Sequence, residues 1–381
     1  MRVALVHDWL TGFRGGERVL DALARIHPEA DLYTLFHVPG STSPRIDRLN
    51  IRASPLSKIW GARRHYRALL PLFPWAIQRF HLEQYDLIVS VSHAVAKAIP
   101  HDPGIPHLCY CLTPMRYIWT QSHHYLGTGV RSQLSLPLVS ALRSFDRKTS
   151  GPKNVDRFVA TSRAVSQRIQ DHYGRASTVL APPVDVARIV PNDRDPEDFY
   201  LLVGGFVPYK REDLAIEAFR QLGLPLFIVG DGPQRNRLEA RAPANVSFLG
   251  RISDAQLADL YARCRALVYP QEEDFGIVAV EAQSAGRPVI AFGRGGVRDT
   301  VIPLEASTGG QPPTGVWFDE QVPEALADAV RHFERNLSRF DSRDIRAWAE
   351  PFGHDRFRRE YAGEVEVTLR SRSAGRGALD P

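Results

Sequence analysis

Short apolar stretches alternate with segments of helical periodicity along this chain. In the first half, four runs rich in Val, Ile and Leu are typical of buried β-strands, and apolar positions three or four residues apart follow the first run. The runs are 3–9, 86–92, 107–112 and 156–162, and the helical spacing is that of Val19, Leu20, Leu23 and Ile26. Alternation of this kind predicts an α/β domain with a parallel sheet and crossover helices.

The second half repeats the rhythm after a break. Residues 183–197 are dense in Pro and charge, and new strand-like runs follow them at 201–205, 225–232, 246–250, 265–270 and 288–293. A chain of 381 residues with 44% hydrophobic content is long enough for two cores. We therefore predict two Rossmann-like βα domains, 1–183 and 184–345, facing a central cleft. A helical segment, 346–369, is expected to be able to return to the N-terminal domain, and 370–381 to form a disordered tail.

The composition restricts the cellular compartments and the binding partners that we expect for this protein. Three cysteines are too few for a disulfide framework and favour a reducing compartment. The N-terminal apolar run is too short for a secretory signal, and no apolar stretch reaches the length of a membrane span. We expect a cytoplasmic protein that can lie peripherally on the inner face of the plasma membrane. The net charge of +5 favours an anionic partner, with nucleotide phosphates, anionic lipid and nucleic acid as the alternatives.

The stretch EEDFGIVAVE, residues 272–281, contains the first candidate chemistry. A loop follows the strand 265–270, and a short helix then ends at Gly286. The amides of Phe275, Gly276 and Ile277 would face an anion at the helix N-terminus. Glu281 stands among apolar neighbours, so its carboxylate needs hydrogen-bond donors, and vicinal sugar hydroxyls are suitable ones. For the acids before the helix, capping by Asp274 and simple solvation of Glu273 remain open alternatives.

A second candidate is the loop VPYKRED, which follows the strand ending in Gly204 and Gly205. Lys210 and Arg211 at the carboxyl end of a strand suit a diphosphate leaving group. The alternative is a basic turn that pairs with Glu212 and the next acid along the chain.

Two further loops lie in the first half. Gly15 and Gly16, with Arg14, lead into a helix N-terminus, which is favourable for anions, although glycine loops are common. Their spacing fits neither a dinucleotide fingerprint nor a P-loop. The strand 107–112 leads into Thr113, Arg116 and Tyr117, which could line a sugar or lipid-linked acceptor site or pack as core.

Residues 57–80 interleave basic and aromatic side chains. This composition fits a segment on an anionic membrane surface, a binder of single-stranded nucleic acid, or a partly buried helical pair with a basic outer face. Metal chemistry finds no support, because the one Asp-x-Asp, Asp193 to Asp195, falls in the presumed linker.

Together, several motifs resemble those of retaining family 4 glycosyltransferases of the GT-B fold. They are Glu273-x7-Glu281 with Phe275-Gly276, the VPYKR loop, the strand end VGDGP and the segment NVSFLGRIS. The N-terminal segments HDWLTGFRGGERVL and TPMRYIW resemble those of a bacterial branch that builds cell-surface polysaccharide.

The resemblance implies a role for each matching residue. Glu281 would bind the ribose hydroxyls, Glu273 would contact the donor sugar, and Lys210 would neutralise the diphosphate. The amides after Phe275 would hold sugar and phosphate, and Gly250, Arg251 and Ile252 would border the base. Two positions depart from the family pattern. Gly205 stands where many relatives have an arginine, so that phosphate contact would either be missing or be supplied by Arg211 or Arg14. Leu112 stands where relatives usually have the histidine before Thr-Pro.

The expected function is therefore transfer of a hexose from a nucleotide sugar to a lipid-linked or polysaccharide acceptor, with retention and without a metal or other cofactor. GDP-mannose is the favoured donor by resemblance, and among the anionic partners we do not expect nucleic acid. A sugar-nucleotide epimerase on the same fold is one alternative. A catalytically weak or inactive nucleotide-sugar-binding partner is another, because of Leu112.

Overall fold

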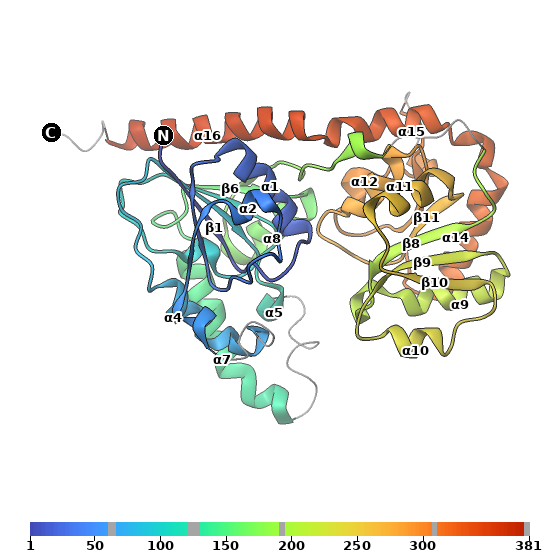
Figure 1. Ribbon diagram of the computed structural model, residues 1–381, viewed down its shortest axis with the longest axis horizontal. Helices are drawn as coiled ribbons and strands as arrows, with labels where there is room; N and C mark the ends of the chain where they lie inside the picture. The colour runs from blue at the N-terminus through green and yellow to red at the C-terminus, as the bar shows by residue number, and fades with distance from the viewer. Residues whose placement is uncertain (60–65, 120–129, 190–194, 307–310, 377–381) are drawn as a thin grey trace. The chain divides into compact units, whose positions relative to one another are not determined.

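The computed structural model describes residues 1–59, 66–119, 130–189, 195–306 and 311–376. The chain divides into two compact units. The first comprises residues 1–183 and 357–381, and the second comprises residues 184–356 (Figure 1). Each unit is an α/β sandwich around its own sheet.

The first unit contains a seven-stranded parallel sheet in the order β3-β2-β1-β4-β5-β6-β7. The strands are β1 (Val3–His7), β2 (Asp31–Thr34), β3 (Asn50–Ala53), β4 (Leu87–Ser92), β5 (His107–Cys111), β6 (Arg157–Ala160) and β7 (Ser177–Val179). The strand order reverses between β1 and β4. In open sheets of this type, ligands bind beyond the carboxyl ends of the strands at such a reversal.

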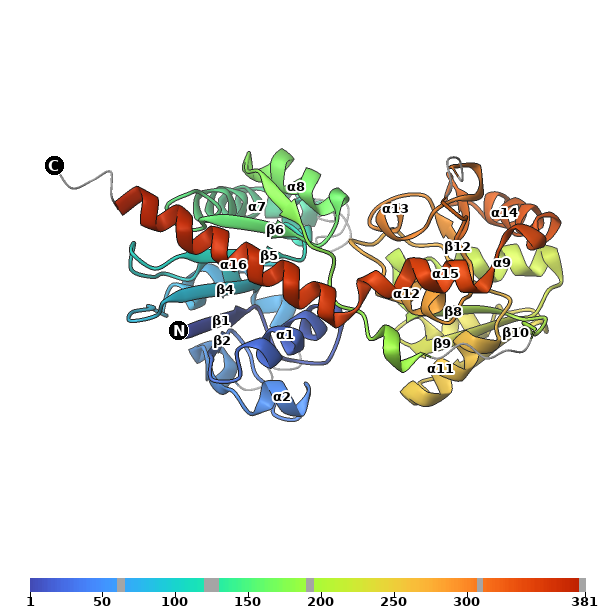
Figure 2. The ribbon, with the colours of Figure 1, turned by 90° about the horizontal axis from the view of Figure 1, so that it is seen from above.

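Helices cover both faces of this sheet. They are α1 (Gly15–Ile26), α2 (Pro44–Asp47), α4 (Phe73–Ile77), α5 (Arg116–Trp119), α7 (Val130–Thr149), α8 (Arg163–Tyr173) and α16 (His354–Arg376), with short 3-10 turns η1 (Pro55–Lys58), η2 (Tyr66–Leu72) and η3 (Ala96–Ala98). Successive residues of β1 point to opposite faces of the sheet. Leu5 packs in the core formed with α1 and α16, whereas Val6 packs in the core formed with α4 and α7. Figure 2 shows α16 crossing the sheet beside α1.

The second unit contains a six-stranded parallel sheet in the order β10-β9-β8-β11-β12-β13. The strands are β8 (Tyr200–Gly205), β9 (Leu226–Asp231), β10 (Val246–Gly250), β11 (Ala266–Tyr269), β12 (Val289–Phe292) and β13 (Gly315–Phe318). The order reverses between β8 and β11.

Its helices are α9 (Glu212–Leu222), α10 (Arg235–Glu239), α11 (Asp254–Arg263), α12 (Ile277–Ser284), α13 (Val297–Thr300), α14 (Pro323–Arg335) and α15 (Ser342–Ala349), with 3-10 turns η4 (Val186–Arg188), η5 (Pro208–Lys210), η6 (Leu304–Ala306), η7 (Leu337–Arg339) and η8 (Glu350–Phe352). Side chains of α9 and α14 share one core, and those of α11 and α12 share the core on the opposite face (Figure 1).

The predicted fold class is confirmed, because each half forms a parallel-sheet, Rossmann-like unit. The cleft expected between the two domains stays a prediction. The second unit continues to Arg356, beyond residue 345, since α15 packs on α12 and Arg346 donates a hydrogen bond to the Ser284 carbonyl at 2.8 Å. The expected disordered tail is wrong for residues 370–376, which form the end of α16, where Arg372 Nε lies 2.7 Å from Asp156 Oδ1. Residues 377–381 lie outside the described part.

Candidate functional site

The main candidate site lies where the strand order of the second unit reverses. Strand β8 leads through η5 to Lys210, and the loop after β11 carries Glu273 and leads into α12. Because β8 and β11 are parallel neighbours, both loops leave the sheet at the same edge. That edge is the usual ligand-binding position of a doubly wound sheet.

Lys210 and Glu273 form a salt bridge at this edge. The Lys210 ammonium contacts Glu273 Oε1, and the Tyr269 hydroxyl donates to Glu273 Oε2 at 2.6 Å. Burial by itself lowers the pKa of Lys210, but the Glu273 carboxylate outweighs that effect and the pKa is raised above its ordinary value. Lys210 is therefore a fixed cation at neutral pH, and it is suited to an anionic ligand.

The turn before α12 brings backbone close to this pair. Gly276 has a φ of 91°, and a Cβ there would lie 2.9 Å from the Tyr269 hydroxyl, so a side chain would be strained and crowded. Phe275 is buried, and Ile277 begins α12. The first amides of α12 have no acceptor within the helix and carry the positive end of its dipole. A phosphate or sugar oxygen could be bound there.

Glu281 lies one turn before the end of α12 and is only 2% exposed. The Tyr261 hydroxyl donates to its Oε2 at 3.0 Å, and Arg188 Nη2 lies 3.4 Å from its Oε1. The sequence argument expected a ribose to supply the donors that Glu281 needs. The structure corrects this reasoning, because the chain supplies donors itself. The ribose-binding role stays a prediction.

The basic loop contains a buried acid that sequence reasoning treated only as a partner for its cations. Arg211 adopts a left-handed conformation, with φ 56°, and its Nε lies 3.3 Å from Asp213 Oδ1. Glu212 is 1% exposed, and neither of its carboxyl oxygens has a hydrogen-bond partner among the described residues. Burial raises the pKa of Glu212 to about 8. Gly205 is exposed, and a Cβ there would meet only the Asp231 carbonyl oxygen, at 3.8 Å, so the position has room for a side chain.

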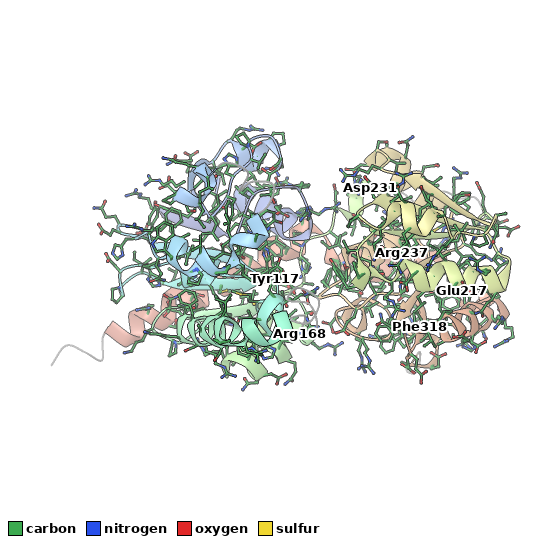
Figure 3. The ribbon with its side chains drawn as sticks, turned by 90° about the horizontal axis from the view of Figure 1, so that it is seen from below. Tyr117, Arg168, Glu217, Asp231, Arg237 and Phe318 are labelled. Carbon is green, nitrogen blue, oxygen red and sulfur yellow. The ribbon has the colours of Figure 1, made fainter. Side chains whose placement is uncertain are left out.

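The expected base-bordering residues lie at the end of β10. Gly250 has a φ of 68°, and the Arg251 side chain is 83% exposed. Arg251 Nε lies 3.5 Å from Asp231 Oδ2, and Asp231 stands at the end of β9 (Figure 3). The neighbouring strands β9 and β10 therefore bring a cation and a carboxylate to the same edge of the sheet.

In the first unit, Gly15 and Gly16 open α1 beside the reversal between β1 and β4. The Arg14 amide donates to Glu17 Oε2 at 2.9 Å, which satisfies one donor of the helix start. A Cβ at Gly16 would lie 2.8 Å from Leu112 Cδ1, so Leu112 packs directly against this turn. The residue at position 112 is thus an apolar contact of α1.

The acceptor-side residues predicted from the sequence lie just after β5. Thr113 is buried, and its hydroxyl has no hydrogen-bond partner in the described part of the chain. Arg116 and Tyr117 belong to α5, where Tyr117 packs partly buried against the core (Figure 3). The position of Tyr117 fits the core-packing alternative, and the acceptor-site role of Thr113, Arg116 and Tyr117 stays a prediction.

Sequence reasoning missed a histidine and carboxylate pair beside them. Asp8 accepts hydrogen bonds from the four successive amides of residues 93–96, and its Oδ2 lies 3.1 Å from His93 Nδ1. Burial, together with the neighbouring His7, lowers the pKa of His93, although Asp8 opposes the shift. A histidine directly after the predicted strand 86–92 was the available signal.

Other missed residues support Glu273. A Cβ at Gly296 would lie 2.2 Å from the Asp274 carbonyl oxygen, and the Gly296 amide donates to the Glu273 carbonyl at 2.8 Å. The signal was the glycine-rich run at 293–296, directly after a predicted strand.

The basic and aromatic segment 57–80 is described only in part. Residues 60–65, including Arg63 and Arg64, lie outside the described residues. Tyr66 and Phe73 are buried in the core, whereas Trp75 is 47% exposed, with the Arg79 guanidinium 5.0 Å from its ring centroid. None of the helices described is both long and apolar enough to cross a bilayer. Across the same residues, no cluster of three or more His, Cys, Asp or Glu could hold a metal ion.

Comparison with known families gives two matches, which together span most of the chain. Residues 13–188 match the family described as Glycosyltransferase Family 4, and residues 185–344 match the family described as Glycosyl transferases group 1. The boundary between the two matches falls at the boundary between the two structural units.

Individual relatives are similar over part of their length. An uncharacterized glycosyltransferase of Methanocaldococcus jannaschii is 29% identical over 241 residues, which cover 58% of this chain and 66% of that protein. A GDP-mannose-dependent alpha-mannosyltransferase of Mycolicibacterium smegmatis is 33% identical over 263 residues, which cover 65% of this chain and 64% of that protein. The chain thus spans slightly less than two thirds of each relative.

Among solved structures, Anabaena HepE in complex with UDP aligns with a TM-score of 0.69 and 15% identity, over 96% of this chain and 100% of that chain. Sucrose-phosphate synthase of Thermosynechococcus elongatus aligns with a TM-score of 0.69 and 19% identity, over 97% of this chain and 100% of that chain. At this level of identity, these similarities establish the fold.

Proposed function

This chain belongs to glycosyltransferase family 4, and from that premise we propose that it is a retaining hexosyltransferase. It moves a hexose from a nucleotide sugar to a lipid-linked or polysaccharide acceptor. The favoured donor is GDP-mannose, and the similarity to a GDP-mannose-dependent alpha-mannosyltransferase of Mycolicibacterium smegmatis supports this choice. The reaction uses no metal or other cofactor, and the enzyme works in the cytoplasm, where it can lie against the anionic inner face of the plasma membrane.

The observation that carries this proposal is the Lys210–Glu273 salt bridge beside the first turn of α12. A nucleotide sugar presents a diphosphate next to a ring of hydroxyls. A lysine held positively charged suits the diphosphate, a carboxylate suits the hydroxyls, and the helix N-terminus suits either group. On donor binding, the diphosphate takes the place of Glu273 as the partner of Lys210, and Glu273 becomes available to the sugar.

In the proposed reaction, the bond between C1 of the sugar and the diphosphate oxygen breaks, and its electron pair leaves with the oxygen. The acceptor hydroxyl oxygen then bonds to C1 on the same face, and its proton passes to the departing diphosphate. Lys210 and the α12 amides stabilise the charge that develops on the leaving group. Preorganised electrostatic stabilisation of this kind is usually a large contribution to catalysis.

A second candidate function, a nucleotide-sugar-binding partner without catalysis, is favoured by one observation. Leu112 occupies the position of the usual family histidine and packs against Gly16. Its side chain is aliphatic and cannot accept a proton from the acceptor hydroxyl. Turnover separates the two candidates.

The test incubates the protein with GDP-mannose or UDP-glucose and a membrane extract, and measures free nucleoside diphosphate together with glycosylated lipid. We expect both products, and we expect Lys210→Met to lower the rate by about 10² to 10³. The matched control is Lys153→Met at an exposed lysine of the first unit, which should retain the wild-type rate. Donor binding without release of diphosphate would favour the binding partner, and no donor binding at all would reject both candidates.

A further inference from the structure

One arginine outside the expected donor-binding residues contacts two segments of the nucleoside region. Arg188 belongs to η4, at the start of the second unit, and its guanidinium is surrounded by carboxylates. Nη2 lies 3.4 Å from Glu281 Oε1, Nη1 lies 3.2 Å from Asp254 Oδ2, and Nε lies 4.0 Å from Asp185 Oδ2. Nη1 also donates to the Asp254 carbonyl at 3.3 Å.

The partners of Arg188 lie in two different segments of the expected nucleoside site. Asp254 is the first residue of α11 and follows shortly after Gly250, where the base is expected. Glu281 is the carboxylate expected to meet the ribose. Arg188 therefore spans from the base-bordering segment to the carboxylate expected to meet the ribose. These two partners belong to α11 and α12, which lie together on one face of the sheet (Figure 1).

Glu281 needs such a neighbour for a physical reason. Its side chain is 3% exposed, and an ionised carboxylate without a partner is costly at that depth. Tyr261 donates to Oε2 from the buried side, whereas Arg188 approaches Oε1 and is itself 23% exposed. A carboxylate whose two oxygens face a vicinal diol accepts a hydrogen bond from each hydroxyl, whereas a rotated one accepts them poorly.

We propose that Arg188 is a positioning residue of the ribose subsite: it keeps the Glu281 carboxylate oriented for the two ribose hydroxyls, and it fixes Glu281 relative to the start of α11. This inference rests on the proposed donor-binding function. It predicts that the part of the affinity that depends on the ribose hydroxyls requires Arg188, whereas the part that comes from the diphosphate does not.

The experiment measures dissociation constants of GDP and of 2′,3′-dideoxy-GDP by calorimetry, with UDP and 2′,3′-dideoxy-UDP as the second pair. Wild-type protein should prefer the ribonucleotide. Arg188→Gln should weaken ribonucleotide binding about tenfold, the effect of losing a hydrogen bond to a charged group, and leave dideoxynucleotide binding within about twofold. Arg188→Lys should recover part of the preference, because one ammonium supplies the charge without the fork that reaches both carboxylates.

Two variants control the interpretation. Arg331→Gln removes an exposed arginine of α14 that pairs with Asp328 and should leave both constants unchanged. Asp254→Asn weakens the anchor of Arg188 while leaving Arg188 and Glu281 in place, and it should reduce the preference in the same direction by a smaller factor. Thermal unfolding of each variant confirms that the protein is folded.

Any of the following results would overturn the inference. Equal weakening of ribo- and dideoxynucleotides would give Arg188 a purely structural role. Tighter ribonucleotide binding in Arg188→Gln would make Arg188 a competitor of the ribose, and an unchanged preference would give it no role. If the wild-type protein binds none of the four nucleotides, the proposed donor binding itself fails, and the premise is lost with it.

Discussion

At the scale of single residues, Glu212 is notable because its acidic side chain lies in a buried position. It follows directly on Lys210 and Arg211 in the sequence, but its carboxyl group is buried and has no hydrogen-bond partner in the described residues. Lys210 favours the ionised form, but burial is the larger effect and raises the pKa to about 8. Glu212 is therefore mostly neutral at neutral pH, so it does not cancel the positive charge of the loop proposed to bind diphosphate.

The raised pKa makes stability depend on pH in a defined direction. The unfolded chain releases this proton near 4.5, and the native state retains it up to about 8. The stabilising effect of the bound proton is complete below the lower value and is lost as the pH rises through the higher one. Across that interval the free energy of unfolding should fall by several kcal/mol, on the order of 1.4 kcal/mol per pKa unit.

We therefore predict that Glu212→Gln, which has the same shape and cannot ionise, loses less stability than the wild type between pH 5 and pH 8.5. Urea unfolding at several pH values measures the difference. Glu217→Gln on the same helix is the matched control, since Glu217 is exposed and pairs only weakly with Arg220 (Figure 3). Parallel curves for the wild type and Glu212→Gln would contradict a buried neutral carboxyl group.

At the scale of secondary-structure elements, α16 completes the core of the first unit, although it follows the second unit in the chain. Phe357 and Tyr361 are each 1% exposed and pack in the core that includes α1. The Tyr361 hydroxyl lies 2.8 Å from His27 Nε2, and Glu364 forms a salt bridge with Arg157. The helix thus covers a face of the sheet that would otherwise be exposed.

We predict that Tyr361→Ala lowers the free energy of unfolding of the first unit by about 3 to 5 kcal/mol, the usual cost of truncating a buried aromatic side chain. Val367→Ala on the same helix should cost less than about 0.5 kcal/mol, because Val367 is 45% exposed. Urea unfolding followed by circular dichroism measures both. Equal effects of the two substitutions would mean that α16 does not dock as described.

Most of the strands predicted correctly have a pattern that reflects burial on both faces. Strands such as β1 and β4 are continuous apolar runs because helices cover them on each side. Strand β3 was not predicted, since it lies at the sheet edge and is mostly exposed, and its four residues, NIRA, include only one large apolar side chain. The helical character of residues 370–376 was also missed; within this segment Arg372 contacts Asp156, which is far away in the sequence.

The candidate site shows the same division. Lys210, Glu273 and Gly276 could be found from the sequence for two reasons. Their loops follow recognisable strands, and the residues belong to motifs that resemble those of a known family. The partners Tyr261 and Arg188 could not, since each reaches Glu281 only through the packing of separate elements. Tyr269 is only four residues from Glu273, but its hydrogen bond depends on the shape of the loop between them. Sequence patterns specify which residues end strands, whereas the hydrogen bonds that orient them are a product of the tertiary fold.

At the scale of the whole molecule, the residues proposed to contact the diphosphate, the sugar and the ribose are concentrated in one of the two units. Lys210, Glu273 and Glu281 belong to the second unit, whereas the glycine loop at Gly15 and Gly16 belongs to the first, and each unit has its own sheet and its own cores. A ligand that binds only folded protein stabilises what it contacts, by about 2.7 kcal/mol at a hundred times its dissociation constant. A nucleoside diphosphate should therefore stabilise one unit directly.

We predict that calorimetric unfolding shows two transitions and that GDP raises the Tm of only one of them. Tyr361→Ala identifies the transition of the first unit, because it removes a buried side chain there and should lower only that Tm. The GDP-sensitive transition should be the other one, and Lys210→Met should abolish its shift. If GDP raises the same transition that Tyr361→Ala lowers, the donor is bound by the first unit, and a single transition that responds to both changes would mean that the units unfold together.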